Sequence, residues 1–417
     1  MKLAFHFDVG RCTGCHACVV ACGNQNGESW REVWSFNERR EPGLPAYHLS
    51  LACNHCEDPA CRSSCPASVY SEDPATGAIL ARTERCLGCR YCAWSCPYDA
   101  PRFQAAEGVV RKCDFCIGRL RAGRRPACVA VCPTGALELV ERAFVADILI
   151  SGDRRPPALS PPVEWASRPA MPASVPASAP NVANFGPRSE WPLVVFTAVA
   201  PVLVALASAA ALSPVAILAL GVLALSVAAA HLGRKSRAWR AISNWRTSWL
   251  SREVLLFAAF LAAAPVSRPT AALLGFAALF AIDRVYQSAL RIPPWRLHSA
   301  QATLGGLYLL GLLSGNRPLA LAAGAVKLAL YLARKIRFYK AAKPTRPWVS
   351  LLRVALGFAL APAAWPAAAL GDLIDRAEFY EDVAWAFLPG RPLGPSAVLP
   401  TSGSAKLEHV TPQLHRR

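Results

Sequence analysis

The hydrophobic and polar positions divide the chain into parts of different character. Residues 1–150 mix charged, polar and apolar positions, as a soluble domain does. Residues 151–190 are rich in Pro, Ala and Ser, and such a segment builds no core, so we expect an extended linker there. From Trp191 onward, apolar segments alternate with short charged loops. This pattern predicts a bundle of helices over residues 191–388 and an irregular tail over residues 389–417.

Seven of the apolar segments predict helices that cross a membrane. Several of their apolar cores are shorter than the ~20 residues that a crossing needs, so those helices must recruit flanking residues or pack inside the bundle. Buried helices of a soluble protein are the alternative, but so many segments in series, with tryptophans near their ends, favour a membrane. An eighth segment, Val383–Leu388, is weaker. The seven segments are Pro192–Leu212, Pro214–Ala230, Val254–Val266, Thr270–Tyr286, Ala300–Leu313, Leu319–Leu332 and Trp348–Leu370, and the tryptophans are Trp191, Trp249, Trp295 and Trp348.

Charge restricts the kind of partner. The chain is 53% hydrophobic and 17% charged, with a formal net charge of +18, and residues 1–150 hold nearly equal numbers of acidic and basic residues. A chain this basic would ordinarily suggest nucleic-acid binding. Here the basic residues cluster between apolar segments, as in the loops of membrane proteins. We therefore exclude nucleic acid as a partner and expect membrane lipid.

The basic residues also lie in alternate loops. Three loops hold most of them, whereas the intervening loops hold only Arg268 and Arg317. By the positive-inside rule, the basic loops and the N-terminal domain face the cytoplasm; alternatively, the arginines dock the N-terminal domain and say nothing about topology. Residues 1–10 contain no apolar stretch typical of a signal peptide. The basic residues are Arg234, Lys235, Arg237, Arg240, Arg246, Arg252, Arg284, Arg291, Arg296, Arg334, Lys335, Arg337, Lys340, Lys343 and Arg346.

All 16 cysteines lie between Cys12 and Cys132, in four groups of four. The first and third groups have the spacing C-x2-C-x2-C-x3-C, which wraps thiolates around a cubane iron–sulfur cluster. Proline follows three of the four closing cysteines. Four groups predict four [4Fe–4S] clusters and therefore a path for single electrons. The groups are Cys12, Cys15, Cys18, Cys22; Cys53, Cys56, Cys61, Cys65; Cys86, Cys89, Cys92, Cys96; and Cys113, Cys116, Cys128, Cys132.

Two other kinds of cysteine site fit this spacing less well. Disulfide frameworks also have even cysteine counts, but a C-x2-C-x2-C run would place rival partners side by side. Structural zinc takes four ligands, usually as two separated pairs, whereas here three cysteines are followed by a fourth. Because the pattern occurs four times, we favour iron–sulfur clusters over both alternatives.

Several short motifs of this sequence resemble subunits of the dimethyl sulfoxide reductase family. The motifs CNHCEDPAC (Cys53–Cys61), CLGCRYCAWSCPY (Cys86–Tyr98) and KCDFC (Lys112–Cys116) resemble its iron–sulfur subunit. The motifs EWPLVVFT, HLG, WLSRE and RVYQS, which begin at Glu190, His231, Trp249 and Arg284, resemble its membrane anchor. The resemblance implies a fusion of two subunits in a bacterial or archaeal cytoplasmic membrane. Its fold would be an α+β double ferredoxin-like domain followed by an all-α polytopic membrane helix bundle.

The resemblance also implies which cysteines share a cluster. In that fold two ferredoxin-like halves interlock, and the fourth cysteine of each group ligates a neighbouring cluster. Arg90 and Arg111 are candidates for raising the reduction potential of nearby clusters, or else they are surface charges. The four implied ligand sets are Cys12, Cys15, Cys18 and Cys132; Cys113, Cys116, Cys128 and Cys22; Cys53, Cys56, Cys61 and Cys96; and Cys86, Cys89, Cys92 and Cys65.

By the same resemblance, His231 belongs to a quinone site, for which we expect Arg252, Glu253 and Arg284 as neighbours. A histidine that titrates near neutral pH suits a reaction in which protons and electrons separate. Alternatively, His231 caps the end of its helix. Haem needs paired axial histidines, and the apolar half offers only His231 and His298, so we expect no haem.

No nucleophile triad, phosphate loop or catalytic carboxylate pair stands out, so the substrate chemistry belongs to a separate chain. We expect an electron-transfer and membrane-anchor subunit that exchanges electrons between menaquinone or ubiquinone and a molybdopterin-containing catalytic subunit. One alternative is the same role in a cytoplasm-facing sulfite dehydrogenase that reduces quinone. The other is a membrane scaffold whose cysteines hold zinc.

Overall fold

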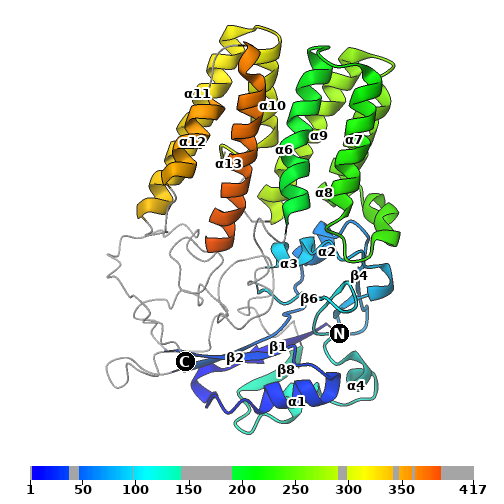
Figure 1. Ribbon diagram of the computed structural model, residues 1–417. Helices are drawn as coiled ribbons and strands as arrows, with labels where there is room; N and C mark the ends of the chain where they lie inside the picture. The colour runs from blue at the N-terminus through cyan, green and yellow to red at the C-terminus, as the bar shows by residue number, and fades with distance from the viewer. Residues whose placement is uncertain are drawn as a thin grey trace. The chain divides into compact units, whose positions relative to one another are not determined.

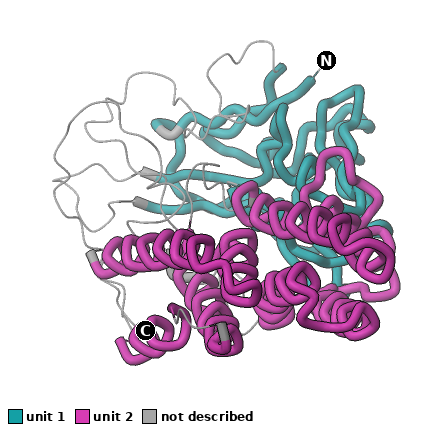
Figure 2. The backbone as a smooth tube through the Cα atoms, turned by 90° about the horizontal axis from the view of Figure 1, so that it is seen from above, with its two compact units in different colours: residues 1–169 teal, residues 170–417 magenta. Residues whose placement is uncertain are grey.

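The computed structural model describes residues 2–36, 47–96, 98–141, 190–289, 298–340, 347–358 and 362–386. The chain forms two compact units, residues 1–169 and 170–417 (Figure 2). Apart from Glu190, the expected linker and the expected C-terminal tail lie outside the described residues.

Unit 1 is an α+β domain of short helices and two-stranded antiparallel sheets, as expected. Its first strand, β1 (Leu3–Phe7), pairs with its last, β8 (Leu137–Glu141), so the two ends of the cysteine region are neighbours. The other pairs are β2 (Glu32–Phe36) with β3 (Tyr47–Leu51), β4 (Tyr70–Glu72) with β5 (Ile79–Ala81), and β6 (Arg102–Gln104) with β7 (Val109–Arg111). The helices are α1 (Ala17–Asn26), α2 (Ala60–Ser64), α3 (Tyr91–Ser95), α4 (Ile117–Arg121) and α5 (Ala127–Ala130), with 3-10 turns at Val9–Arg11 and Thr83–Arg85.

The first and third cysteine groups bend the backbone at equivalent positions. Gly14 and Gly88 have φ of 67° and 72°, and His16 and Arg90 both have φ of 60°. Glycine enters this left-handed region without steric cost, which favours glycine before the second cysteine of each group. Each bend is followed directly by a helix, α1 or α3. Similar local sequences therefore give similar cysteine loops.

Unit 2 is helical. Figure 1 shows α6–α9 and α10–α13 as two groups of helices with roughly parallel axes. Helix α6 packs against α10 and α13 as well as against α7 and α9, and so joins the two groups. The helices are α6 (Trp191–Ser208), α7 (Pro214–Ala229), α8 (Trp249–Ala263), α9 (Arg268–Ala289), α10 (Ala302–Leu313), α11 (Arg317–Lys340), α12 (Pro347–Gly357) and α13 (Trp365–Ala386), with 3-10 segments at Lys235–Ile242 and Pro362–Ala364.

Two of the predicted segments differ from the helices that the structure shows. Helix α11 continues to Lys340, beyond the expected end at Leu332, because Arg334 and Lys335 pair with carboxylates of α13 instead of entering a loop. The expected segment Trp348–Leu370 is divided into α12 and α13. The break contains Pro362, and a proline inside a helix removes a backbone hydrogen bond and clashes with the preceding turn.

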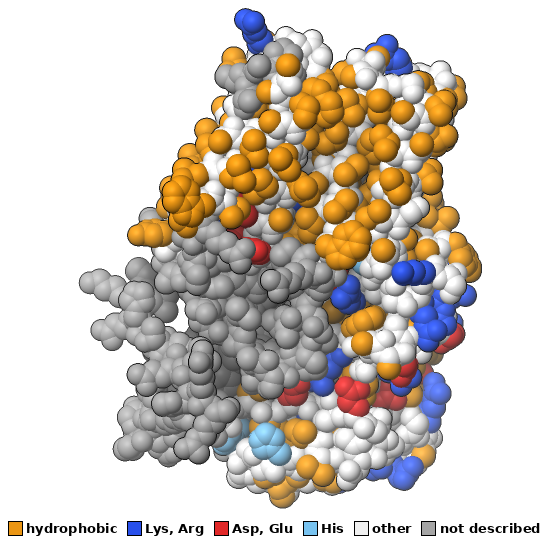
Figure 3. Space-filling view, in the orientation of Figure 1, with side chains coloured by type: hydrophobic (Ala, Val, Ile, Leu, Met, Phe, Trp, Pro, Cys, Tyr) orange, Lys and Arg blue, Asp and Glu red, His pale blue; other side chains and the backbone are white. Residues whose placement is uncertain are grey.

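The outer surface of unit 2 is apolar. By length and composition, α6 and residues Arg268–Ser288 of α9 are able to cross a membrane, and α7, α10 and α12 are shorter apolar helices. Hydrophobic side chains cover much of the visible face of the described helices (Figure 3). Large side chains on these helices and the loops between them remain exposed, among them Val266 (82%), Val215 (76%) and Trp348 (81%). An apolar surface of this kind is unusual for a soluble monomer and indicates a membrane or a partner.

Candidate functional site

The cysteine thiols of unit 1 lie near thiols from other groups of the sequence. Cys12 interacts electrostatically with Cys15 and Cys18, and also with Cys132, which closes the fourth group. Cys116 likewise interacts with Cys128 and with Cys22, which closes the first group. The folding that brings β1 and β8 together therefore also brings the first and fourth groups together.

The second and third groups are related in the same way. Cys61 interacts with Cys53, Cys56 and Cys96, the last of which closes the third group. In the other direction, Cys65 closes the second group but interacts with Cys86. A cavity is lined by Cys65 together with Cys86, Cys89 and Cys92. These neighbours agree with the implied ligand sets, and Cys18 and Cys113 also interact with thiols of another set, Cys128 and Cys53 respectively.

Backbone N–H groups point at several of the sulfurs. The N–H groups of Gly88 and Val110 both donate to Cys86 Sγ at 3.4 Å. Trp30 N–H donates to Cys22 Sγ at 3.3 Å and Leu137 N–H to Cys132 Sγ at 3.4 Å. Hydrogen bonds to ligand sulfurs stabilise the negative charge of a reduced cluster and so raise its reduction potential.

The buried thiols fit a positively charged iron core. Burial raises the pKa of Cys65 to about 11 and that of Cys96 to about 12, although backbone N–H groups partly oppose this. A buried thiolate therefore needs nearby positive charge, which iron supplies when a cluster is bound. The cysteine-lined cavity and the hydrogen bonds to sulfur are features that suit a [4Fe–4S] cluster.

The cysteines do not form a site for a single metal ion. Among the described residues, which include all 16 cysteines, no three His, Cys, Asp or Glu side chains are placed to hold one ion. Zinc–sulfur bonds of about 2.3 Å would draw four sulfurs close together. A cubane binds each thiolate to a different iron and so keeps the sulfurs farther apart.

Two buried cations lie among the cysteines, and neither was predicted from the sequence. Lys112, only 6% exposed, donates from Nζ to the carbonyl oxygens of Ile79 and Cys113 and interacts with the thiols of Cys53, Cys61 and Cys113. In the sequence, the only sign of its role is its place directly before a C-x2-C pair.

Arg31 is the second buried cation. It is 2% exposed and donates to Ser50 O at 3.3 Å and to Ser50 Oγ at 3.1 Å. Its guanidinium interacts with the thiols of Cys18, Cys113 and Cys128, which belong to two of the implied ligand sets. No pattern in the sequence marks Arg31 as different from other arginines.

The two arginines that the sequence suggested for tuning potentials have different environments. Arg90 lines the cavity with Cys89, lies over the ring of Phe103 and interacts electrostatically with the Cys89 thiol. Arg111 is exposed and pairs with Glu107 at 2.6 Å. Among the interactions of the described residues, only Arg90 of these two arginines interacts with a cysteine thiol.

The residues suggested for a quinone site lie in unit 2. Arg252 and Arg284 face the same ring, that of Trp249, at 4.4 and 5.2 Å from its centroid. Glu253 is buried and interacts electrostatically with Arg376 and Asp283, which the sequence analysis did not single out. His231 follows α7, is half-buried, and its Nδ1 is close to the carbonyl oxygen of Ala228. The structure thus brings Arg252 and Arg284 together and turns Glu253 toward α13.

Comparisons with known proteins match the cysteine region. A family model described as a 4Fe–4S dicluster domain matches residues 45–142. One chain of the anaerobic dimethyl sulfoxide reductase of Haemophilus influenzae is 38% identical over 150 residues, which cover 33% of this protein and 73% of the relative. One subunit of the sulfite dehydrogenase of Allochromatium vinosum is 32% identical over 160 residues, covering 32% of this protein and 67% of the relative.

A third relative is a subunit of another kind of enzyme, a formate dehydrogenase. The iron–sulfur subunit of the nitrate-inducible formate dehydrogenase of Escherichia coli is 35% identical over 157 residues, which cover 33% of this protein and 53% of the relative. These matches cover about a third of the sequence. This protein therefore belongs to the family of iron–sulfur electron-transfer subunits of molybdopterin oxidoreductases, which includes the matching chain of dimethyl sulfoxide reductase.

Proposed function

We propose that this chain carries electrons through four [4Fe–4S] clusters between membrane quinone and a separate molybdopterin-containing catalytic subunit. The observation that carries the proposal is the exchange of closing cysteines, in which Cys65 lies with the third group and Cys132 with the first. Thiolates are soft ligands that suit iron–sulfur chemistry. Four clusters in one small domain provide successive sites for single electrons.

The second part of the proposal is that residues 191–388 anchor the chain in a bacterial or archaeal cytoplasmic membrane as about seven or eight crossings. The apolar outer surface of unit 2 and the exposed Trp191 and Trp348 at the starts of α6 and α12 support this. Small residues let the helices approach closely, since a Cβ on Gly311 would lie 2.6 Å from Ala320 N. Trp295, which also belongs to the expected belt, lies outside the described residues.

For the quinone we propose a site at His231, Arg252, Glu253 and Arg284, without haem. A buried carboxylate and a histidine provide proton acceptors, and two arginines on one tryptophan ring provide positive charge. Oxidation of quinol releases two electrons and two protons. The electrons pass one at a time to the clusters, and the protons leave through titratable side chains.

The same parts support a second function, a sulfite dehydrogenase subunit that faces the cytoplasm and reduces quinone. The relative from Allochromatium vinosum and the basic 3-10 segment with its flanking loop favour it. Arg334 and Lys335 carry no weight in this topology argument, because both lie in α11 and pair with carboxylates.

The test uses the full chain in lipid nanodiscs after anaerobic purification. Dithionite reduces the clusters, excess reductant is removed, and absorbance follows their reoxidation by a short-chain menaquinone or ubiquinone. We expect rapid reoxidation that requires His231. Clusters that stay reduced with both quinones, yet are oxidised by ferricyanide, would refute the quinone role while leaving the electron path intact.

A further inference from the structure

Arg31, directly before β2, lies where the first and fourth cysteine groups meet. Its Nη1 donates to Ser50 Oγ of β3 at 3.1 Å. The same hydroxyl lies 3.4 Å from Cys18 Sγ, so one serine joins the guanidinium to a thiol of the first group. The guanidinium also lies over the ring of Phe5 of β1, with 4.7 Å between the guanidinium carbon and the ring centroid.

The Phe5 ring connects this position to the fourth group. Phe5 and Cys18 both pack against a small core that contains Cys128. Phe5 also meets the ring of Phe115 edge to face, with 4.7 Å between the centroids, and Phe115 N–H donates to Cys113 Sγ at 3.4 Å. These contacts place the guanidinium between thiols of two implied ligand sets, in agreement with its electrostatic interactions with thiols of both.

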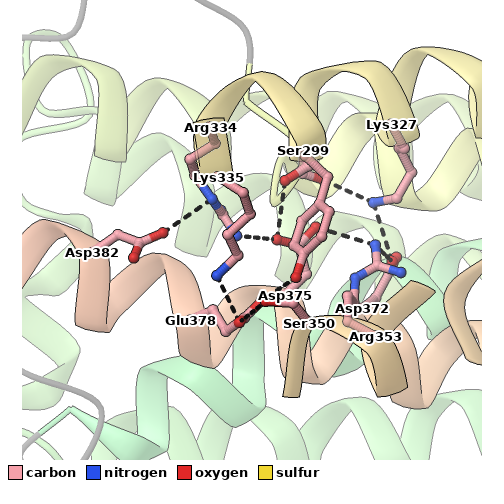
Figure 4. Close-up of polar contacts among 11 residues, drawn as sticks. Ser299, Lys327, Arg334, Lys335, Ser350, Arg353, Asp372, Asp375, Glu378 and Asp382 are labelled. Atoms are coloured by element: carbon pink, nitrogen blue, oxygen red, sulfur yellow. Dashed lines mark hydrogen bonds and ion pairs between the residues drawn. The ribbon is translucent and has the colours of Figure 1, made fainter. Parts of the chain in front are cut away.

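The Arg31 charge lacks the compensation that buried arginines of unit 2 have. Arg353 Nη2, for example, is 3.1 Å from Asp375 Oδ2 (Figure 4). Arg31 is 2% exposed, its Nη1 donates to two neutral oxygens of Ser50, and its Nε has no hydrogen-bond partner among the described residues. A buried charge without an opposite charge destabilises a fold. A [4Fe–4S] cluster with four thiolate ligands is an anion, so two bound clusters would supply the missing charge.

A second buried cation occupies the next boundary between ligand sets. Lys112 interacts with the thiols of Cys113 and Cys53, and these two thiols also interact with each other. The Phe115 ring stacks on His55, two residues after Cys53, with 4.6 Å between the centroids. The set that contains Cys113 therefore has a buried cation at each of these two boundaries.

We propose that Arg31 is a charge shared by two neighbouring [4Fe–4S] clusters, whose reduction potentials it raises together. The inference rests on the proposed four-cluster function. Each cluster that accepts one electron gains one negative charge, and a fixed cation beside it stabilises the reduced state. Arginine suits this role because its guanidinium does not lose its proton in a protein. The two clusters are those expected on Cys12, Cys15, Cys18 and Cys132 and on Cys113, Cys116, Cys128 and Cys22.

A shared charge affects the electron path differently from a charge at one cluster. A cation beside one cluster alone would hold the electron there and slow its transfer to the neighbour. A cation between two clusters moves both potentials in the same direction, so both become easier to reduce without an added energy step between them. Arg31 thus keeps two successive sites of the path accessible to the same electron donor.

The experiment is a potentiometric titration of the full chain in lipid nanodiscs, followed by EPR. Dithionite and soluble redox mediators supply the electrons, so the result does not depend on quinone. Serine variants, one for each ligand set, assign the four potentials: Cys18→Ser, Cys56→Ser, Cys89→Ser and Cys116→Ser.

Arg31→Gln keeps a donor for Ser50 but removes the charge. At a fixed potential, we expect the ratio of reduced to oxidised cluster to fall at least about tenfold in both clusters, which corresponds to about 59 mV. The fall is this large because charges inside a protein are screened much less than charges in water. Arg31→Lys keeps the charge and should restore most of the lost ratio in both clusters.

Arg11→Gln is the matched control. Arg11 directly precedes Cys12, but its side chain is 51% exposed and its Nη1 is 3.5 Å from Glu138 Oε1. An exposed, paired charge is screened by water, so this variant should leave every ratio within about threefold of the wild type.

Lys112→Gln tests whether the two cations act at different boundaries. It should lower the ratio of the cluster with Cys113 more than that of the cluster with Cys12, because Lys112 interacts with the Cys113 thiol. The same pattern of falls in Arg31→Gln and Lys112→Gln would overturn the proposal.

Iron content separates the remaining outcomes. Wild-type protein with far fewer than about sixteen iron atoms per chain would refute the proposed function, and this inference with it. With full iron content, unchanged potentials in Arg31→Gln, or a fall in one cluster alone, would overturn the shared charge while the four-cluster function stands. Loss of iron in both Arg31→Gln and Arg31→Lys, without a shift in the remaining potentials, would assign Arg31 a purely structural role.

Discussion

Replacing Lys112 with glutamine should lower the reduction potential of the cluster expected on Cys53, Cys56, Cys61 and Cys96. The Lys112 ammonium is buried and interacts with the thiols of Cys53 and Cys61. Reduction adds one negative charge to a cluster, so a fixed positive charge beside it stabilises the reduced state. Glutamine retains a donor for the carbonyl oxygens of Ile79 and Cys113 but removes the charge.

The size of the shift in reduction potential follows from the distance between the Lys112 charge and the cluster. Because Lys112 interacts with the Cys53 side chain, its charge would lie about 6 Å from the centre of a cluster bound there. At that distance and an effective dielectric constant of about 20, one charge contributes ~3 kcal/mol. For a one-electron couple, about 1.4 kcal/mol corresponds to about 59 mV. We therefore expect a fall of about 120 mV.

The assay is a potentiometric titration of the full chain, followed by EPR, with iron content as the check that all clusters are present. Two control variants test whether the buried charge of Lys112 causes the fall in reduction potential. Lys112→Arg keeps the charge and should shift the potential by less than about 30 mV. Arg111→Gln removes the neighbouring charge, which is exposed and paired with Glu107, and should have a similarly small effect. An equal fall in Arg111→Gln and Lys112→Gln, or no fall in Lys112→Gln with full iron content, would refute the reasoning.

Three further predictions concern the clusters and the quinone. Metal analysis should find about sixteen iron atoms per chain, and stoichiometric zinc with little iron would contradict the four-cluster proposal. Cys65→Ser should change the EPR signal of the cluster on Cys86, Cys89 and Cys92, because its fourth thiolate comes from the preceding group; a change confined to another cluster would show that the ligand set is wrong. His231→Ala should slow quinol oxidation by about 10²-fold while electron transfer from a dye to the clusters survives, and normal quinol kinetics would remove His231 from the site.

The sequence by itself determined the chemistry of the first unit. Cysteine spacing acts locally, since the loop between neighbouring cysteines is short and glycines such as Gly14 and Gly88 set its bend. The prediction of an iron–sulfur subunit of the dimethyl sulfoxide reductase family is confirmed by the relatives, and the α+β domain followed by a helical part is confirmed by the fold. Hydropathy located the helices of unit 2 but misplaced the end of α11 and missed the break before α13, because ion pairs and prolines decided those boundaries.

Tertiary structure decided which distant residues share an environment. Cys65 meets Cys86, and Lys112 meets Cys53, only because separate loops of unit 1 fold onto one another. Arg334 looked like a loop charge in the sequence, yet it lies inside the bundle because Asp375, 41 residues later, pairs with it. Burial and partner choice depend on contacts between distant parts of the chain, and a local pattern of residue types contains no information on either.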